Sequence, residues 1–271
     1  MTGKGERDTT ADAALAESLT GTIVKAAEAI RAFDFRHADT RLKPDHSPVT
    51  AADEASEAII LSELARIAPG VPIVSEECAG APPAAATFFL VDPLDGTREF
   101  IAGRDEYTIN IALVRDGVPT VGLIAAPARG LVWRGVVGRG AERLSFSTGS
   151  ARPDATLPIH TRAWPAHPVA AVSRSHFEQA SAAFLRRFEP IEQLECGSAL
   201  KFGCIAEGSA DVYPRFGPTC EWDVAAGHAL VVSAGGVMTA PDGAPLRYGV
   251  TPGFRVPGFI VWGDPARAKP P

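Results

Sequence analysis

The chain has 271 residues and a formal net charge of −6. This length suits one large domain or two modest ones, and it can bury a hydrophobic core without disulfides or structural metals. A net acidic chain is a poor candidate for coating a nucleic acid polymer, which selects basic surfaces. The four cysteines form no Cys-x-x-Cys pair, so we expect free thiols in a reducing compartment rather than a structural zinc site.

The sequence also bears on the expected location of the protein. Its first residues do not combine a basic start with an apolar run of signal-peptide length, and no stretch is apolar enough to be an integral membrane span. We therefore expect a cytoplasmic protein. Loose association with the inner face of a membrane, and a homodimer, are left open at this point.

The first half of the chain predicts two helices followed by a meander of strands. Residues 11–33 carry an apolar stripe at steps of three or four, which is typical of an amphipathic helix. A capping box from Thr50 to Asp53 opens a second helix, which Pro69-Gly70 ends. Strands are expected at 71–75, 87–92, 108–114, 120–126 and 131–137, with a hairpin turn at Asp116-Gly117.

The pattern changes after this meander. Residues 138–158 are rich in Gly, Ser, Arg and Pro, and we interpret them as the surface region between two domains. The expected domains are an α+β domain over 11–150 and an α/β domain over 151–271. The expected elements of the second are a strand at 169–173, helices at 177–188, 198–207 and 223–234, and a closing strand at 258–262.

Two aspartates, Asp92 and Asp95, end the predicted strand 87–92. Carboxylates this close repel each other and are costly to bury, and a hard cation such as Mg²⁺ removes both problems. Gly96 allows close approach of the backbone to a ligand, and Thr97 adds a hydroxyl. The plainer alternative is an Asp-rich surface turn that caps a helix.

Three more carboxylates stand at the ends of predicted elements. Glu76 follows a strand, Asp223 begins the last long helix, and Asp53 lies in the first turn of the second helix. Each has a plain explanation: a solvated turn, an acid at a helix N-terminus, or part of a cap. All of them can converge on Asp92 and Asp95, which favours a metal site.

Taken in order, these motifs resemble the inositol monophosphatase superfamily over about residues 11–262. The motifs are Lys43…Asp45-x-Ser47-Pro48-Val49-Thr50-x-x-Asp53, Ser75-Glu76-Glu77, Asp92-Pro93-Leu94-Asp95-Gly96-Thr97 and Trp222-Asp223-x-Ala225-Ala226-Gly227. The resemblance implies an α+β fold, the layered α-β-α-β-α sandwich of the inositol monophosphatase and fructose-1,6-bisphosphatase type.

Further stretches resemble the 3′(2′),5′-bisphosphate nucleotidase branch of this superfamily. They are Arg98-Glu99-Phe100, Ser173-Arg174-Ser175-His176, residues 197–202 and residues 213–219. Arg98 departs from that branch, which usually has Lys there, and the polar N-terminus is longer. The implied activity is lithium-sensitive, Mg²⁺-dependent hydrolysis of the 3′-phosphate of adenosine 3′,5′-bisphosphate, or of its 5′-phosphosulfate relative. An inositol- or sugar-phosphate phosphatase of the same superfamily and a catalytically inactive nucleotide or metal sensor are the alternatives.

The resemblance also implies roles for individual residues, with two or three Mg²⁺ ions in the site. Glu76, Asp92 and the carbonyl of Leu94 would hold the first ion, and Asp92, Asp95 and Asp223 the second. The expected catalytic residues are Asp53, Thr97 and Glu76, with Asp53 and Thr97 orienting and deprotonating the metal-bound water.

The substrate is expected to be a small phosphorylated nucleotide. Backbone N–H groups at Gly96 and Thr97 would cradle the scissile phosphate. Lys201 and Arg215 are the basic candidates for the second phosphate, with Ser173 and Ser198 as hydroxyl donors. The full expected set is Glu76, Leu94, Asp95, Gly96, Thr97, Ser173, Ser198, Lys201, Arg215 and Asp223.

Several of these substrate assignments have plain alternatives. Lys201 can equally be solvent-exposed. His176 can stack on a base or lie on the surface without a role. Tyr213 and Phe216 can belong to the core.

Overall fold

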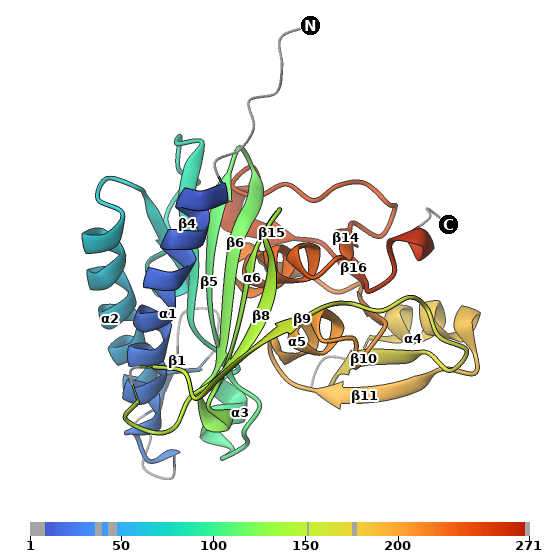
Figure 1. Ribbon diagram of the computed structural model, residues 1–271, viewed down its shortest axis with the longest axis horizontal. Coiled ribbons are helices and arrows are strands. Elements are labelled where there is room, and N and C mark those ends of the chain that lie inside the picture. The colour runs from blue at the N-terminus through green and yellow to red at the C-terminus, as the bar shows by residue number, and fades with distance from the viewer. Residues whose placement is uncertain (1–8, 36–39, 43–47, 151, 175–177, 269–271) are drawn as a thin grey trace, which may run out of the picture.

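A computed structural model describes residues 9–35, 40–42, 48–150, 152–174 and 178–268. These residues form five layers, α/β/α/β/α (Figure 1). Helices α1 (Thr9–Arg31) and α2 (Ala51–Ile67) lie side by side over one face of a seven-stranded sheet. Helices α5 (Leu200–Ala206) and α6 (Glu221–Ser233) lie between this sheet and a five-stranded one. The expected layered sandwich is confirmed.

The seven-stranded sheet has the order β3-β4-β5-β6-β7-β8-β9. Its strands are β3 (Ile73–Ser75), β4 (Thr87–Asp95), β5 (Thr108–Arg115), β6 (Val118–Ala126), β7 (Leu131–Val136), β8 (Gly140–Ser145) and β9 (Ala155–Ile159). Alternate residues of β4 face opposite layers: Phe89 packs with α1 and α2, whereas Leu90 packs with α5 and α6. The expected hairpin joins β5 to β6, with positive φ at both Asp116 and Gly117.

The interpretation of residues 138–158 as a surface connection is wrong. This segment contributes β8 and β9, which extend the first sheet through Ile159. Four of the five residues of the edge strand β9 are exposed, so it carries no alternation of apolar and polar residues. The division into domains 11–150 and 151–271 stays a prediction.

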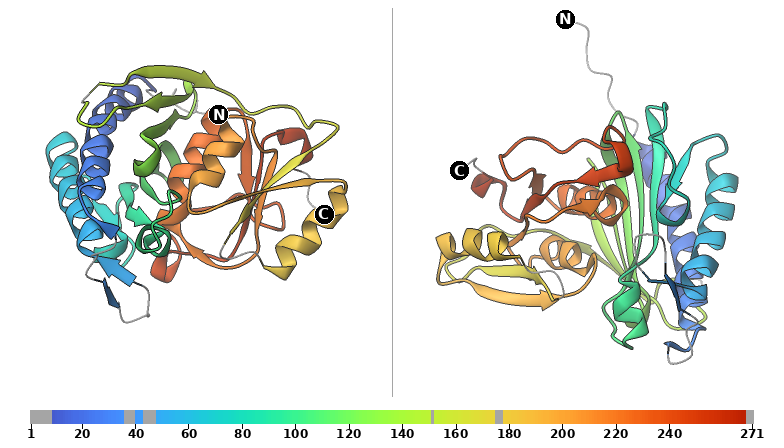
Figure 2. Two further views of the ribbon diagram at one scale, coloured as in Figure 1. Left: turned by 90° about the horizontal axis from the view of Figure 1, so that it is seen from below. Right: turned by 180° about the vertical axis from the view of Figure 1, so that it is seen from behind.

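The five-stranded sheet has the order β11-β10-β12-β16-β14, and α4 (Gln179–Leu185) packs on its outer face. Its strands are β10 (Val169–Ser173), β11 (Glu192–Cys196), β12 (Val212–Arg215), β14 (Val237–Thr239) and β16 (Phe259–Trp262). Strands β10 and β11 are parallel, so their carboxyl ends meet at one edge, which faces the first sheet (Figure 2). Strands β11, β12 and β14 were not predicted.

Helix α3 (Thr97–Ile101) follows β4. Two short antiparallel pairs complete the strands of the described fold: β1 (Thr40–Leu42) with β2 (Pro48–Thr50), and β13 (Thr219–Cys220) with β15 (Arg255–Val256). None of the helices in the described ranges is long and apolar enough to cross a membrane.

Candidate active site

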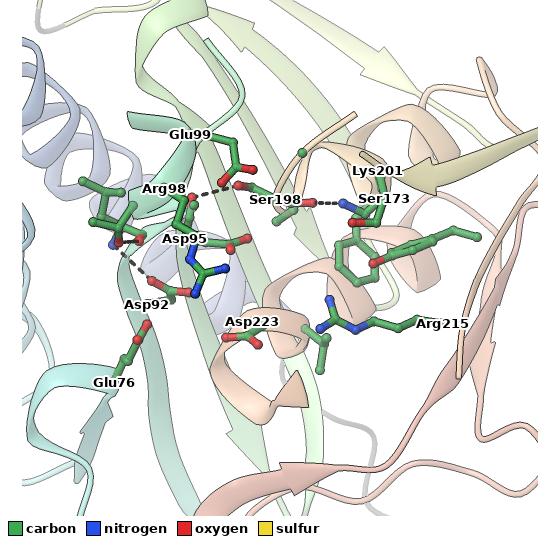
Figure 3. A pocket seen from close by; sticks show the side chains of 18 of the residues that line it. Glu76, Asp92, Asp95, Arg98, Glu99, Ser173, Ser198, Lys201, Arg215 and Asp223 are labelled. Carbon is green, nitrogen blue, oxygen red and sulfur yellow. Dashed lines mark hydrogen bonds between the residues drawn. The ribbon is translucent and has the colours of Figure 1, made fainter. Parts of the chain in front are cut away.

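A pocket of about 240 Å³ lies where the end of β4 meets the first turn of α6 and the carboxyl ends of β10 and β11 (Figure 3). It gathers side chains from both halves of the chain. Most of the predicted site residues line it, namely Glu76, Asp92, Leu94, Asp95, Gly96, Thr97, Ser173, Ser198, Lys201, Arg215 and Asp223. Of the predicted catalytic residues, Asp53 lies behind this lining.

A bulge in β4 explains how Asp92 and Asp95 come to share one pocket. Residues three apart on a regular strand point to opposite faces of the sheet. Asp92 pairs with Asn110 and Asp95 with Thr108, so three steps along β4 match two along β5. The extra residue brings both carboxylates to the same side. The carbonyl of Pro93 inside the bulge accepts a hydrogen bond of 2.7 Å from the Ser56 hydroxyl.

Glu76 and Asp223 reach the same place from neighbouring elements. Glu76 follows β3, which runs parallel to β4 and pairs Ser75 with Val91. Asp223 belongs to the capping box that opens α6, and its Oδ2 accepts a hydrogen bond of 3.0 Å from the Cys220 N–H. Glu76, Asp92 and Asp223 each offer an oxygen within 4.8 Å of the others. Asp223 is therefore both a helix cap and a member of the acidic cluster.

The carboxylates of this cluster repel one another, and a bound cation would offset that repulsion. Burial, followed by the charges of Glu76, Asp95 and Asp223, raises the pKa of Asp92 well above its ordinary value. Burial and the charge of Asp223 raise the pKa of Asp95 to about 6. Hard divalent cations bind such oxygen donors and relieve their repulsion. The donor set therefore fits a divalent metal ion.

Asp53 supports the pocket through Thr97. Its Oδ2 accepts hydrogen bonds from the N–H and the hydroxyl of Thr50, at 2.9 and 2.6 Å, which forms the predicted capping box of α2. Its Oδ1 accepts a hydrogen bond of 3.0 Å from the Thr97 hydroxyl. Burial raises the pKa of Asp53, and these hydrogen bonds oppose the rise. The cap explanation of Asp53 is thus confirmed, and its catalytic role stays a prediction.

The opposite side of the pocket is basic. Lys201 is only 2% exposed, so the alternative of a solvated side chain is wrong. Its ammonium donates hydrogen bonds to the carbonyls of Ser198 and Cys196, at 2.6 and 3.2 Å. Arg215 donates to the Pro218 carbonyl at 3.2 Å, and its buried Nε has no hydrogen-bond partner among the described residues.

Some aromatic and motif residues also have a clear place. Tyr213 packs edge-on against Phe202 and Phe259 and also lines the pocket, whereas Phe216 packs against Phe184 under α4. Lys43, Asp45, Ser47 and His176 lie outside the described residues.

Sequence reasoning missed several residues at or near the pocket. Arg98 and Glu99 line it, and their position directly after the Asp92–Thr97 motif is a signal that could have placed them there. Glu106 binds Arg174 through two hydrogen bonds of 2.9 Å at the junction of the two sheets. No local pattern marks Glu106, because its partner lies on another sheet.

The comparisons with known proteins agree with this geometry. The model of the inositol monophosphatase family matches residues 6–257. The 3′(2′),5′-bisphosphate nucleotidase CysQ of Salmonella typhimurium is 39% identical over 233 residues, which cover 81% of this chain and 87% of that protein. The histidinol-phosphatase of Mycobacterium tuberculosis is 32% identical over 213 residues, covering 76% of this chain and 79% of that protein.

The crystal structure of CysQ from Bacteroides thetaiotaomicron superposes with a TM-score of 0.79 at 33% identity, over 91% of this chain and 96% of that one. The family match spans the first sheet, four of the five strands of the second and every described member of the acidic cluster. The chain therefore belongs to the inositol monophosphatase family.

Proposed function

We propose that this protein is a Mg²⁺-dependent 3′(2′),5′-bisphosphate nucleotidase. It would hydrolyse the 3′-phosphate of adenosine 3′,5′-bisphosphate to give AMP and phosphate, with the 5′-phosphosulfate relative as a further substrate. The observation that carries the proposal is one pocket with the carboxylates of Glu76, Asp92, Asp95 and Asp223 on one side and the cationic groups of Lys201 and Arg215 on the other. A substrate with two separate phosphates matches both sides. The bisphosphate nucleotidase relative named above supports the nucleotide assignment.

The acidic side would hold the metal. Glu76, Asp92 and the Leu94 carbonyl form one ligand group, and Asp92, Asp95 and Asp223 a second, which shares Asp92. Bound divalent cations supply positive charge to the phosphate oxygens and make water more acidic.

Thr97 and Asp53 would act on the attacking water. The Thr97 hydroxyl has its acceptors within the protein, Asp53 Oδ1 at 3.0 Å and the Leu94 carbonyl at 3.3 Å. Its oxygen can therefore accept a hydrogen bond from water in the pocket. Because burial raises the pKa of Asp53, this carboxylate is a stronger base than a free aspartate. Asp53 would thus orient Thr97 and receive the proton that the water loses.

The basic side would hold the second phosphate. Two of the three ammonium protons of Lys201 are directed to carbonyls, which leaves one for a ligand. The planar guanidinium of Arg215 can bind two phosphate oxygens at once. Both groups lie opposite the carboxylates in Figure 3.

A substrate panel tests the proposal. Phosphate release with Mg²⁺ is compared for adenosine 3′,5′-bisphosphate, inositol 1-phosphate, fructose 1,6-bisphosphate and histidinol phosphate. We expect the nucleotide to have the highest kcat/KM and lithium to inhibit its turnover. A preference for any of the other three would reject the nucleotide assignment in favour of the sugar-phosphate or histidinol-phosphate alternative.

Two variants address the roles of the two sides. Arg215→Ala should raise the KM for the nucleotide, whereas Arg247→Ala, an exposed arginine on the Asp116 carbonyl, should not. Asp92→Asn should abolish turnover and weaken Mg²⁺ binding. Full activity of Asp92→Asn would refute the metal-site account, and absence of turnover in the unsubstituted enzyme would favour a sensor.

A further inference from the structure

Glu106 joins the two sides of the pocket although it is not part of either. It lies just before β5, in the first half of the chain. Arg174, after β10, donates hydrogen bonds of 2.9 Å to each of its carboxylate oxygens, and the Gly197 N–H, after β11, donates one of 3.0 Å to Oε2. One carboxylate therefore holds the carboxyl ends of two neighbouring strands of the second sheet.

The backbone of Glu106 makes a further connection through Ser198. The Ser198 hydroxyl lies 2.8 Å from the Glu106 carbonyl and 2.9 Å from the Asp95 carbonyl. A hydroxyl has a single proton, so these carbonyls share it. Ser198 also adopts a left-handed backbone with φ of 46°, which is uncommon for a residue other than glycine. Its proton is thus directed to the backbone of the metal-binding loop rather than into the pocket.

At these contacts the two sides of the pocket are packed too closely to admit an extra methyl group. A Cβ atom on Gly96 would lie 2.2 Å from the Ser198 hydroxyl oxygen, and one on Gly197 would lie 2.8 Å from the Glu106 carbonyl. The acidic side, at Asp95 and Gly96, and the basic side, at Gly197 and Ser198, are therefore in direct contact at one point. Their separation across the rest of the pocket depends on how this point is held.

Neighbouring arginines favour the ionised form of Glu106. Hydrogen bonds from Arg174 hold the pKa of Glu106 below its ordinary value. Arg129, from the first half of the chain, places its Nη2 at 4.0 Å from Glu106 Oε1. The side chain of Glu106 is 11% exposed and that of Arg174 is 38% exposed, so water screens this pair only in part.

We infer that Glu106 is a positioning residue, which sets the separation of the acidic and basic sides by holding Arg174 and residues 197–198. It does not touch the reacting atoms. Loss of its charge would release the end of β10, which carries Ser173, and residues 197–198, which lead into α5 and Lys201. A substrate that spans both sides would then bind more weakly. The inference rests on the proposed function only for the identity of that substrate.

The test uses Glu106→Gln, which keeps the size of the side chain, with Glu142→Gln as the matched control. Glu142 accepts a hydrogen bond of 2.8 Å from Arg134 between β7 and β8, away from the pocket. KM and kcat are measured with the two-phosphate substrate that the unsubstituted enzyme hydrolyses fastest, and with p-nitrophenyl phosphate, which needs only the acidic side. The Mg²⁺ concentration for half-maximal activity is measured in parallel.

We expect Glu106→Gln to raise the KM for the two-phosphate substrate by about tenfold, the effect of losing one charged hydrogen bond. Turnover of p-nitrophenyl phosphate and the Mg²⁺ requirement should stay unchanged. Arg174→Gln should have a similar effect, and the double variant should lose less than the sum of the two single losses, because both single variants break the shared Glu106–Arg174 pair. The conservative Arg174→Lys should recover part of the affinity.

Two results would overturn the inference: an unchanged KM in Glu106→Gln, or equal losses with both substrates. If Glu106→Gln does not fold, as judged by its thermal unfolding, the Arg174 variants decide the question by the same two criteria. An enzyme that prefers a two-phosphate ester other than the nucleotide would reject the proposed function alone, because the positioning effect is measured on that ester.

Discussion

Thr97 donates a hydrogen bond of 3.0 Å to Asp53 although 44 residues separate them in the sequence. The same Asp53 carboxylate caps the first turn of α2 through Thr50. Because the cap fixes the backbone and the side chain of Asp53 together, the oxygen that faces Thr97 has a defined direction. A local folding signal thus supplies part of the geometry that we propose for catalysis.

We expect Asp53→Asn to lower kcat by a factor of about 10² to 10⁴, the usual loss when a general base is removed. The metal-free variant should be no less stable than the unsubstituted protein, because burial raises the pKa of Asp53 and its ionised form opposes folding at neutral pH. Steady-state kinetics and thermal unfolding without metal measure both effects. Glu54→Gln is the control, because this neighbour is exposed and pairs only with Arg41 among its described contacts. An equal loss of kcat in both variants would contradict the role of Asp53.

Metal binding should stabilise the protein more at neutral than at acidic pH. Burial and Asp223 raise the pKa of Asp95 from 3.8 to about 6 in the metal-free protein. Between these values the folded state holds a proton that the unfolded state has lost, so the free energy of unfolding falls as the pH rises. A cation replaces that proton. We expect Mg²⁺ to raise the melting temperature more at about pH 7.5 than at about pH 5, and a chelator to reverse the rise. An equal increase at both pH values would count against a buried carboxylate site.

The sequence predicted the elements with strong local signals. Helices α1 and α2 follow from the apolar stripe and from the Thr50–Asp53 capping box, and the β5–β6 hairpin follows from Asp116-Gly117. Strands β9 and β11 were missed because they lie at sheet edges, where four of five residues are exposed in each. Edge strands carry little hydrophobic alternation, so their position depends on contacts that the local sequence does not encode.

The candidate site likewise combines features that the local sequence predicts with features that depend on tertiary contacts. The carboxylates stand in recognisable motifs at element ends, and the structure gathers them in one pocket. Neither the β4 bulge that aligns Asp92 with Asp95 nor the burial of Lys201 follows from a local pattern. Both depend on the pairing of β4 with β5 and on the packing of α5 between the sheets.

Two buried titratable groups on α6, His228 and Glu221, should have opposite effects on the free energy of unfolding as the pH changes. Burial lowers the pKa of His228 to about 4 from 6.5, and its Nδ1 lies 2.9 Å from the Tyr248 hydroxyl. The unfolded state binds more protons between these values, so this histidine destabilises the fold as the pH falls from 6.5 to 4. Burial raises the pKa of Glu221 to about 7 from 4.5. Between these values the folded state holds a proton that the unfolded state has lost, so the free energy of unfolding falls as the pH rises from 4.5 to 7.

We therefore expect His228→Asn to change how the free energy of unfolding varies with pH, and not only its value at one pH. Relative to the unsubstituted protein, the variant should gain up to about 3 kcal/mol in free energy of unfolding between pH 6.5 and pH 4, the value of the missing histidine shift. Glu221→Gln should move the slope in the opposite direction. Urea unfolding of metal-free protein across this range measures both. Parallel curves for the variant and the parent would mean that His228 does not titrate abnormally.

A comparison of Gly96→Ala with Gly70→Ala should separate the effect of backbone strain from the effect of the contact with Ser198. Gly96 has φ of 93°, and a Cβ there would lie 2.2 Å from the Ser198 hydroxyl oxygen. Gly70 has φ of 82° at the end of α2, with nothing within 4 Å of a built Cβ, so Gly70→Ala is the matched control. Both variants should lose about 1 to 2 kcal/mol of stability from the left-handed backbone. Only Gly96→Ala should also lower kcat/KM, because the alanine methyl group pushes Ser198 and the basic side away from Asp95. Equal activity in the two variants would show that the pocket tolerates this displacement.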